Sequence, residues 1–167
     1  MSTELIIAMF ENDEERAGKA LENAQKLAKD GSINLHDIAA IVKHKDGKVE
    51  IKDIGDVRPK KGAVFGAITG GLIGLAAGPG GAIIGAIAGA ATGGGAAKLI
   101  DYGVSEDMIK EVEEKLQPGS SAVIAYAEMS FAESIVRQLE ESGATVIHET
   151  LESQSLDDMA DGYGRTM

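Results

Sequence analysis

The feature that most constrains this chain is an uncharged, glycine-rich stretch from Gly62 to Ala97, which holds thirteen glycines. Its glycines recur at every fourth residue in two runs, a regularity that a random linker would not keep. The first run is Gly62, Gly66, Gly70, Gly74 and Gly78, and the second is Gly81, Gly85, Gly89 and Gly93. The turn-forming sequence GPGG lies where the two runs meet. The spacing predicts two helices in a hairpin, each with a glycine stripe on which another helix can lie closely.

Three other interpretations of the stretch fail on its letters. A P-loop ending at Lys98 would need a glycine where Ala97 stands, and a dinucleotide-binding GxGxxG beginning at Gly78 would need one where Ile83 stands. A flexible linker would not carry so many apolar residues between its glycines. Each glycine inside a helix costs roughly 1 kcal/mol relative to alanine, so close packing against a neighbour must compensate for the stripe.

The surroundings of the predicted hairpin have two alternatives. Each arm would be roughly 25 Å long as a helix, slightly short of the roughly 30 Å hydrocarbon core of a bilayer. A pre-packed hairpin can nevertheless enter the bilayer, with Arg58, Lys60, Lys61 and Lys98 meeting the headgroups at the cytoplasmic side. The second alternative is a hairpin buried among identical hairpins in a soluble cytoplasmic oligomer. The sequence favours the membrane and leaves the oligomer open.

Length and charge limit the function of the whole chain. It has 167 residues, enough for one core, no cysteine, no tryptophan and a net charge of -11. The absence of cysteine excludes disulfides and thiolate chemistry. From Lys98 onward there are fifteen acidic and five basic residues, so binding of nucleic acid through clustered Lys and Arg is not expected. The N-terminal residues lack a basic region followed by a long apolar run, so we expect no signal peptide.

Outside the glycine-rich stretch, the apolar pattern predicts two similar units of strand, helix and strand. The first begins with a strand at residues 4–10 and continues with a helix, for which Asn12 or Asp13 is the N-cap. The second has a strand at residues 121–128, a helix ending near Gly143 and a final strand. Two such units forming one antiparallel sheet with helices on one face predict an α+β, ferredoxin-like sandwich.

Two further elements complete this prediction. Asp46-Gly47 is a predicted two-residue turn between the strands of a β-hairpin, and Ser105 is a predicted N-cap for a patterned helix that ends at Pro118. The predicted division is a discontinuous ferredoxin-like domain (1–57 and 104–152), a glycine-zipper hairpin insertion (58–103) and an acidic tail (153–167).

The layout resembles a known family. The strand ending in Phe10-Glu11-Asn12, the basic lead Arg58 to Gly62 and the glycine hairpin resemble the bacterial and archaeal family called domain of unknown function twelve-sixty-nine. The resemblance covers the chain from about Glu4 to Leu151. Its members are described as predicted membrane proteins, and the family is similar to glycine-zipper stress-induced proteins. The resemblance implies membrane association and a link to stress, and it carries over no catalytic residue.

No catalytic, cofactor or metal site is expected from the remaining residues. His36, His44 and His148 have no ligand spacing, although His44 and His148 would lie on neighbouring strands of one sheet in one arrangement. The carboxylate clusters are explained by helix starts and solvated faces. None of the serines lies in a GxSxG sequence.

The sequence therefore predicts a non-enzymatic protein that forms a homo-oligomer through the stripe glycines, with the sandwich domain projecting the hairpin. Arg58, Lys60, Lys61 and Lys98 are the predicted contacts to lipid. The alternatives are a soluble ligand-binding or sensory module, in which His44 or His148 converges with Tyr126 on a cavity, and a soluble shell or filament.

Overall fold

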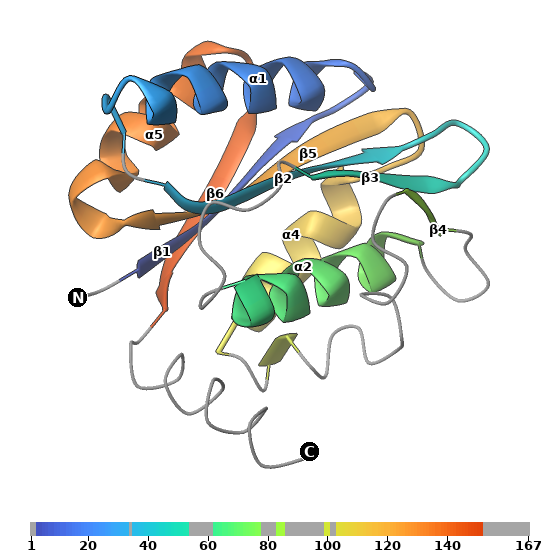
Figure 1. Cartoon of the computed structure of the whole chain (residues 1–167). Coiled ribbons are helices and arrows are strands. Elements are labelled where there is room, and N and C mark those ends of the chain that lie inside the picture. The colour runs from blue at the N-terminus through green and yellow to red at the C-terminus, as the bar shows by residue number, and fades with distance from the viewer. Residues whose placement is uncertain are drawn as a thin grey trace.

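The computed structural model of the protein describes residues 3–33, 35–53, 62–77, 83–85, 99–100 and 103–151. Its centre is a six-stranded sheet in the order β4-β3-β2-β5-β1-β6 (Figure 1). The strands are β1 (Thr3–Phe10), β2 (Leu35–Lys43), β3 (Val49–Asp53), β4 (Ile83–Gly85), β5 (Ser120–Glu128) and β6 (Thr145–Leu151). The five longer strands pair in antiparallel fashion, and the short β4 adds to β3 in parallel. The predicted α+β class is confirmed.

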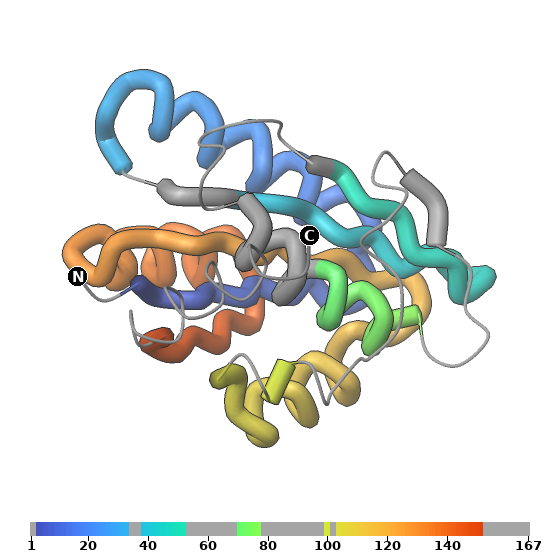
Figure 2. Tube along the Cα trace, turned by 60° about the horizontal axis from the view of Figure 1, so that its bottom comes forward, coloured from blue at the N-terminus to red at the C-terminus, as the bar shows by residue number. Residues whose placement is uncertain are grey.

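Helices cover both faces of this sheet. The described helices are α1 (Arg16–Lys29), α2 (Gly62–Ala77), α4 (Glu106–Lys115) and α5 (Met129–Glu141). Helices α1 and α5 lie above the sheet in Figure 1, and α2 and α4 lie below it, where they contact each other (Figure 2). The helices of the two predicted units, α1 and α5, lie on one face as expected. The second face, which a two-layer sandwich would leave open, is covered by α2 and α4.

The two-sided covering explains why the central strands are apolar along their whole length. In β1, the side chains of Leu5, Ile7 and Met9 belong to the core under α2 and α4. The intervening Ile6 and Ala8 belong to the core under α1 and α5. Successive side chains of a strand point to opposite faces, so a strand buried on both sides shows a continuous apolar run rather than an alternating one.

Local signals placed several elements correctly. The side chain of Ser105 accepts a hydrogen bond from the amide of Met108 at 3.2 Å, so it is the N-cap of α4 as predicted. The predicted hairpin of β2 and β3 is confirmed, with Gly47 in its turn at a φ of 87°. The turn is longer than the predicted two residues, since β2 ends at Lys43 and β3 begins at Val49.

The glycine-rich stretch differs from its prediction in two ways. Its first arm is the helix α2, as expected, but α2 packs on the sheet through the buried Leu72, Ile73 and Ala76 instead of projecting from it. The predicted helix beginning at Gly81 is wrong for residues 83–85, which form β4. The two isoleucines of β4 favour a strand, and β3 offers them an unpaired edge, which outweighs the glycine spacing there.

Candidate functional site

The predicted glycine stripe is only partly visible. Gly62, Gly66, Gly70 and Gly74 share the helix α2, and Gly85 lies in β4. Gly78, Gly81, Gly89 and Gly93 lie outside the described residues, as do the predicted lipid contacts Arg58, Lys60, Lys61 and Lys98. In the part of the chain that the structure describes, no helix is both long enough and apolar enough to cross a membrane.

On α2, neighbouring glycines have different environments. Gly70 and Gly71 are buried beside Leu72 and Ile73, which are 1% and 0% exposed. Gly74, in contrast, is half-buried, and a Cβ atom built there would meet no atom within 4 Å. The described fold therefore has space for a side chain at position 74. Glycine is nevertheless present there, even though a glycine inside a helix costs roughly 1 kcal/mol of stability relative to alanine.

A polar cluster lies at the end of the sheet where β2 turns into β3. The ring of His44 contacts Glu14 through Nδ1 and Glu50 through Nε2, each at 2.9 Å. The second oxygen of Glu14 accepts a hydrogen bond from the amide of Lys45 at 3.2 Å. The hydrogen bonds of the ring to Glu14, which has the larger effect, and to Glu50 raise the pKa of His44, because both carboxylates favour the protonated ring. His44 thus ties the segment before α1 to β3.

The same end of the sheet carries an open hollow of about 640 Å³. It is lined by Asn12, Asp13, Glu14, His44, Lys45, Asp46 and Gly119. The buried Ser121 fixes its wall by donating to the Asp13 carbonyl at 2.6 Å and accepting from the Ala17 amide at 3.2 Å. Across the described residues, no three His, Asp or Glu side chains are grouped to hold a metal ion.

The other candidate residues do not converge with His44. His148 lies on β6, separated from β2 by β5 and β1, so it is not on a neighbouring strand. It contacts the buried Glu4 at 3.0 Å, and Thr150 also donates to Glu4. Tyr126 belongs to the core between the sheet and helices α2 and α4, where burial raises the pKa of its phenol. The predicted cavity joining a histidine to Tyr126 is therefore not found among these side chains. The side chain of His36 lies outside the described residues.

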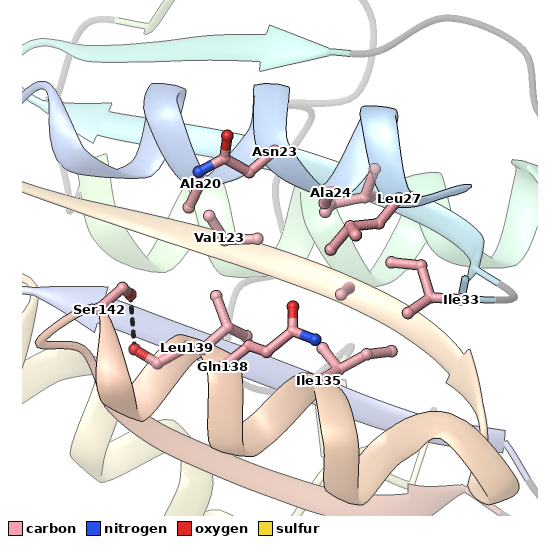
Figure 3. A pocket seen from close by; sticks show the side chains of 12 residues that line it. Ala20, Asn23, Ala24, Leu27, Ile33, Val123, Ile135, Gln138, Leu139 and Ser142 are labelled. Carbon is pink, nitrogen blue, oxygen red and sulfur yellow. Dashed lines mark hydrogen bonds between the residues drawn. The ribbon is translucent and has the colours of Figure 1, made fainter. Parts of the chain in front are cut away.

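A separate cleft of about 100 Å³ lies between α1 and α5 over the sheet (Figure 3). Its apolar lining is Ala20, Ala24, Leu27, Ile33, Ile38, Val123, Ala125, Ile135 and Leu139. Asn23, Gln138 and Ser142 add neutral polar groups. Ala20 and Ala24 of α1 face this space (Figure 3), and their short side chains leave it unfilled.

Sequence reasoning missed both the His44 cluster and the cleft. The cluster joins residues that are 30 and 6 positions apart, and they meet only because the segment before α1 packs against the loop between β2 and β3. The cleft has a weak signal in the sequence, because Ala20 and Ala24 stand where larger residues would fill the face of α1.

The fold and these sites define an α+β protein in which a glycine-rich helix is part of the core beneath a sheet. The chain belongs to the family described as protein of unknown function (DUF1269), whose model matches residues 63–162, more than half of the chain. This confirms the family inferred from the sequence, although the match begins at α2 and not at Glu4 as the resemblance did; it includes α4, β5, α5 and β6. No curated protein and no solved structure matches the chain.

Proposed function

We propose that this protein is a non-enzymatic, self-associating protein whose copies meet at the open side of α2 around Gly74. The observation that carries the proposal is the space beside Gly74, where a Cβ atom would meet nothing within 4 Å. The described fold does not require a glycine at this position of the helix. Close approach of the backbone of another molecule would require one. Glycine stripes allow such close approach between helices.

The composition of α2 supports the same proposal. Its sixteen residues include no charged side chain, so the helix is apolar on all sides. Such a helix is normally buried all round. The core of its own chain takes up Leu72, Ile73 and Ala76, whereas Gly74 and Leu75 remain half-buried. A second copy of the chain at this side would complete the burial.

We further propose that the domain is a ferredoxin-like sandwich. The strands β6, β1, β5 and β2 lie side by side in this order and pair in antiparallel fashion. They come from two units of strand, helix and strand, with α1 and α5 on the same face. This arrangement of a split βαβ pair supports the ferredoxin-like assignment.

Association within a protein assembly is favoured over insertion of α2 in a bilayer. Leu72 and Ile73 are already taken up by the sheet, and pulling α2 into lipid would expose the apolar face of β2 and β3 that it covers. Lipid contact by Arg58, Lys60, Lys61 and Lys98 remains the alternative, as does a link to stress.

A non-enzymatic role is also part of the proposal. Both ring nitrogens of His44 are engaged by carboxylates, so the ring is held as a structural link rather than presented to a substrate. His148 contacts Glu4 across the pair of β6 and β1, where Thr150 binds the same carboxylate.

The test compares Gly74→Leu with the wild-type chain, using native mass spectrometry and sedimentation without detergent. We expect a wild-type oligomer and a folded Gly74→Leu monomer, because the added side chain fits the monomer and blocks the contact. Ser134→Leu is the matched control, since it adds the same side chain at an exposed position of α5 and is expected to remain oligomeric. A monomeric wild type, or an oligomer unchanged by Gly74→Leu, would overturn the proposal. Sedimentation with membranes and release only by detergent would favour the lipid alternative.

A further inference from the structure

The cleft between α1 and α5 has the features of a small-molecule site, and it lies on the opposite face of the sheet from α2 (Figures 1 and 3). Its floor is formed by Val123 and Ala125 of β5 and by Ile38 of β2. Its sides are the facing residues of the two helices, including Ala24 on α1 and Leu139 on α5. Ligand sites of proteins are typically concave and mostly apolar, with a few polar groups that orient the ligand.

The polar groups of the cleft are all uncharged. Asn23 and Gln138 lie on the two helices and are exposed, so their amides can donate and accept hydrogen bonds at the mouth. The hydroxyl of Ser142 donates to the carbonyl of Leu139 at 2.6 Å, which leaves its oxygen as an acceptor (Figure 3). A ligand with a hydroxyl or an N–H group would complete the hydrogen bonding.

We infer that this cleft binds a small, uncharged molecule with a compact hydrocarbon body and one hydroxyl or amide group. Three observations decide the class. The volume of about 100 Å³ admits a single ring or a short branched chain. The apolar lining has no aromatic or charged member, so neither ring stacking nor a charged ligand is supported. The neutral polar groups at the mouth match a single polar group at one end of the ligand.

The lack of charged side chains in the lining also supports an uncharged ligand. The lining residues supply no counter-charge, and the nearby Arg16 guanidinium donates to the backbone carbonyl of Ser142 at 2.9 and 3.2 Å. Burying an ionised ligand group against the alkyl lining is therefore costly, so a carboxylate or an ammonium group is disfavoured in this cleft. The same hydrocarbon body carrying a hydroxyl group avoids that cost. This gives a paired comparison in which the hydrocarbon ring is kept and a neutral hydroxyl group is replaced by a carboxylate.

The test is a titration of the full chain, labelled at the methyl groups of Ile, Leu and Val, with cyclohexanol and with cyclohexanecarboxylate. For cyclohexanol we expect saturable shifts at Leu27, Val123, Ile135 and Leu139, with a Kd on the order of 1 mM. We expect at least tenfold weaker binding of the carboxylate. No saturable shift, shifts at other methyl groups, or equal binding of the two probes would overturn the inference.

Two variants change the cleft in opposite directions. Ala24→Leu fills it and is expected to weaken cyclohexanol binding at least tenfold, whereas Lys26→Leu adds the same side chain to an exposed position of α1 and is expected to leave binding unchanged. Leu139→Ala enlarges the cleft and is expected to favour cyclooctanol over cyclohexanol. It keeps the inference testable if Ala24→Leu does not fold. If a folded Ala24→Leu or Leu139→Ala variant binds the two alcohols as the wild type does, the site assignment is overturned. This outcome does not depend on the oligomeric state of the protein.

Discussion

At the residue scale, His44 makes the stability of the fold depend on pH. Contacts with Glu14 and Glu50 raise the pKa of its ring above the ordinary value of 6.5. A raised folded pKa means that the stabilisation is fully present below the unfolded pKa and is lost as the pH rises through the folded pKa. We expect His44→Asn to lower the free energy of unfolding more near pH 6 than near pH 9, as measured by urea denaturation.

The two carboxylates provide the control for this prediction. Glu14→Gln and Glu50→Gln each replace one of the two carboxylates that contact the ring by a neutral amide, which removes a negative charge that favours the protonated ring. Each is expected to lower the pKa of His44 in an NMR titration and to reduce the pH dependence. If His44→Asn lowers stability equally at both pH values, the ring contributes by packing rather than through its charge.

The His44 cluster is a contact between residues far apart in the chain, and such contacts cannot be predicted from the sequence alone. Ser105 was recognisable as an N-cap because a cap and its helix are adjacent in the chain. Glu14, by contrast, is 30 residues from His44, and nothing local distinguishes it from the neighbouring acidic residues. Its partner becomes visible only when the position of β2 in the sheet is known.

At the element scale, α2 was predicted as a helix, but its packing partner was not. A helix that is apolar on all sides has no polar face to show which side meets the core. Helices α4 and α5 do have a polar side, and their buried residues lie on one face, as with Met108, Ile109 and Val112 of α4. The pattern therefore identified α2 as buried without identifying what buries it.

The packing of α2 on the sheet is tested by Ile73→Ala. Ile73 is completely buried in the core shared by the sheet, α2 and α4, so we expect a loss of about 2–5 kcal/mol in the free energy of unfolding. Leu75→Ala is the control on the same helix, because Leu75 is only half-buried and is expected to cost less. Chemical denaturation followed by circular dichroism gives both values. An Ile73→Ala variant as stable as the wild type would mean that α2 is not part of the folded core in solution.

At the scale of the whole molecule, the covering of both faces leaves few surfaces for self-association. The face that a simple two-layer sandwich would leave open is occupied by α2 and α4. At the β6 edge, His148 and Thr150 are exposed and both contact Glu4 of the neighbouring strand β1. Among the surfaces of the described residues, the open side of α2 is the one that we propose for contact between copies.

The order of the strands predicts how the molecule opens. β5 and β1 each have a strand on both sides and helices on both faces, whereas β6 has a described neighbour on one side only. Amides released only by global unfolding exchange most slowly, and edge strands open locally at a lower cost. We expect hydrogen exchange measured by mass spectrometry to be slowest in β5 and β1 and faster in β6.

The same experiment separates the two sources of protection for α2. If α2 is held by its own sheet, its exchange in the monomeric Gly74→Leu variant should stay close to that of the wild type. If instead contact between copies holds it, α2 should lose protection in the variant while β5 and β1 keep theirs. Faster exchange in β5 than in β6 would contradict the expectation that the edge strand opens at a lower cost than the central strands.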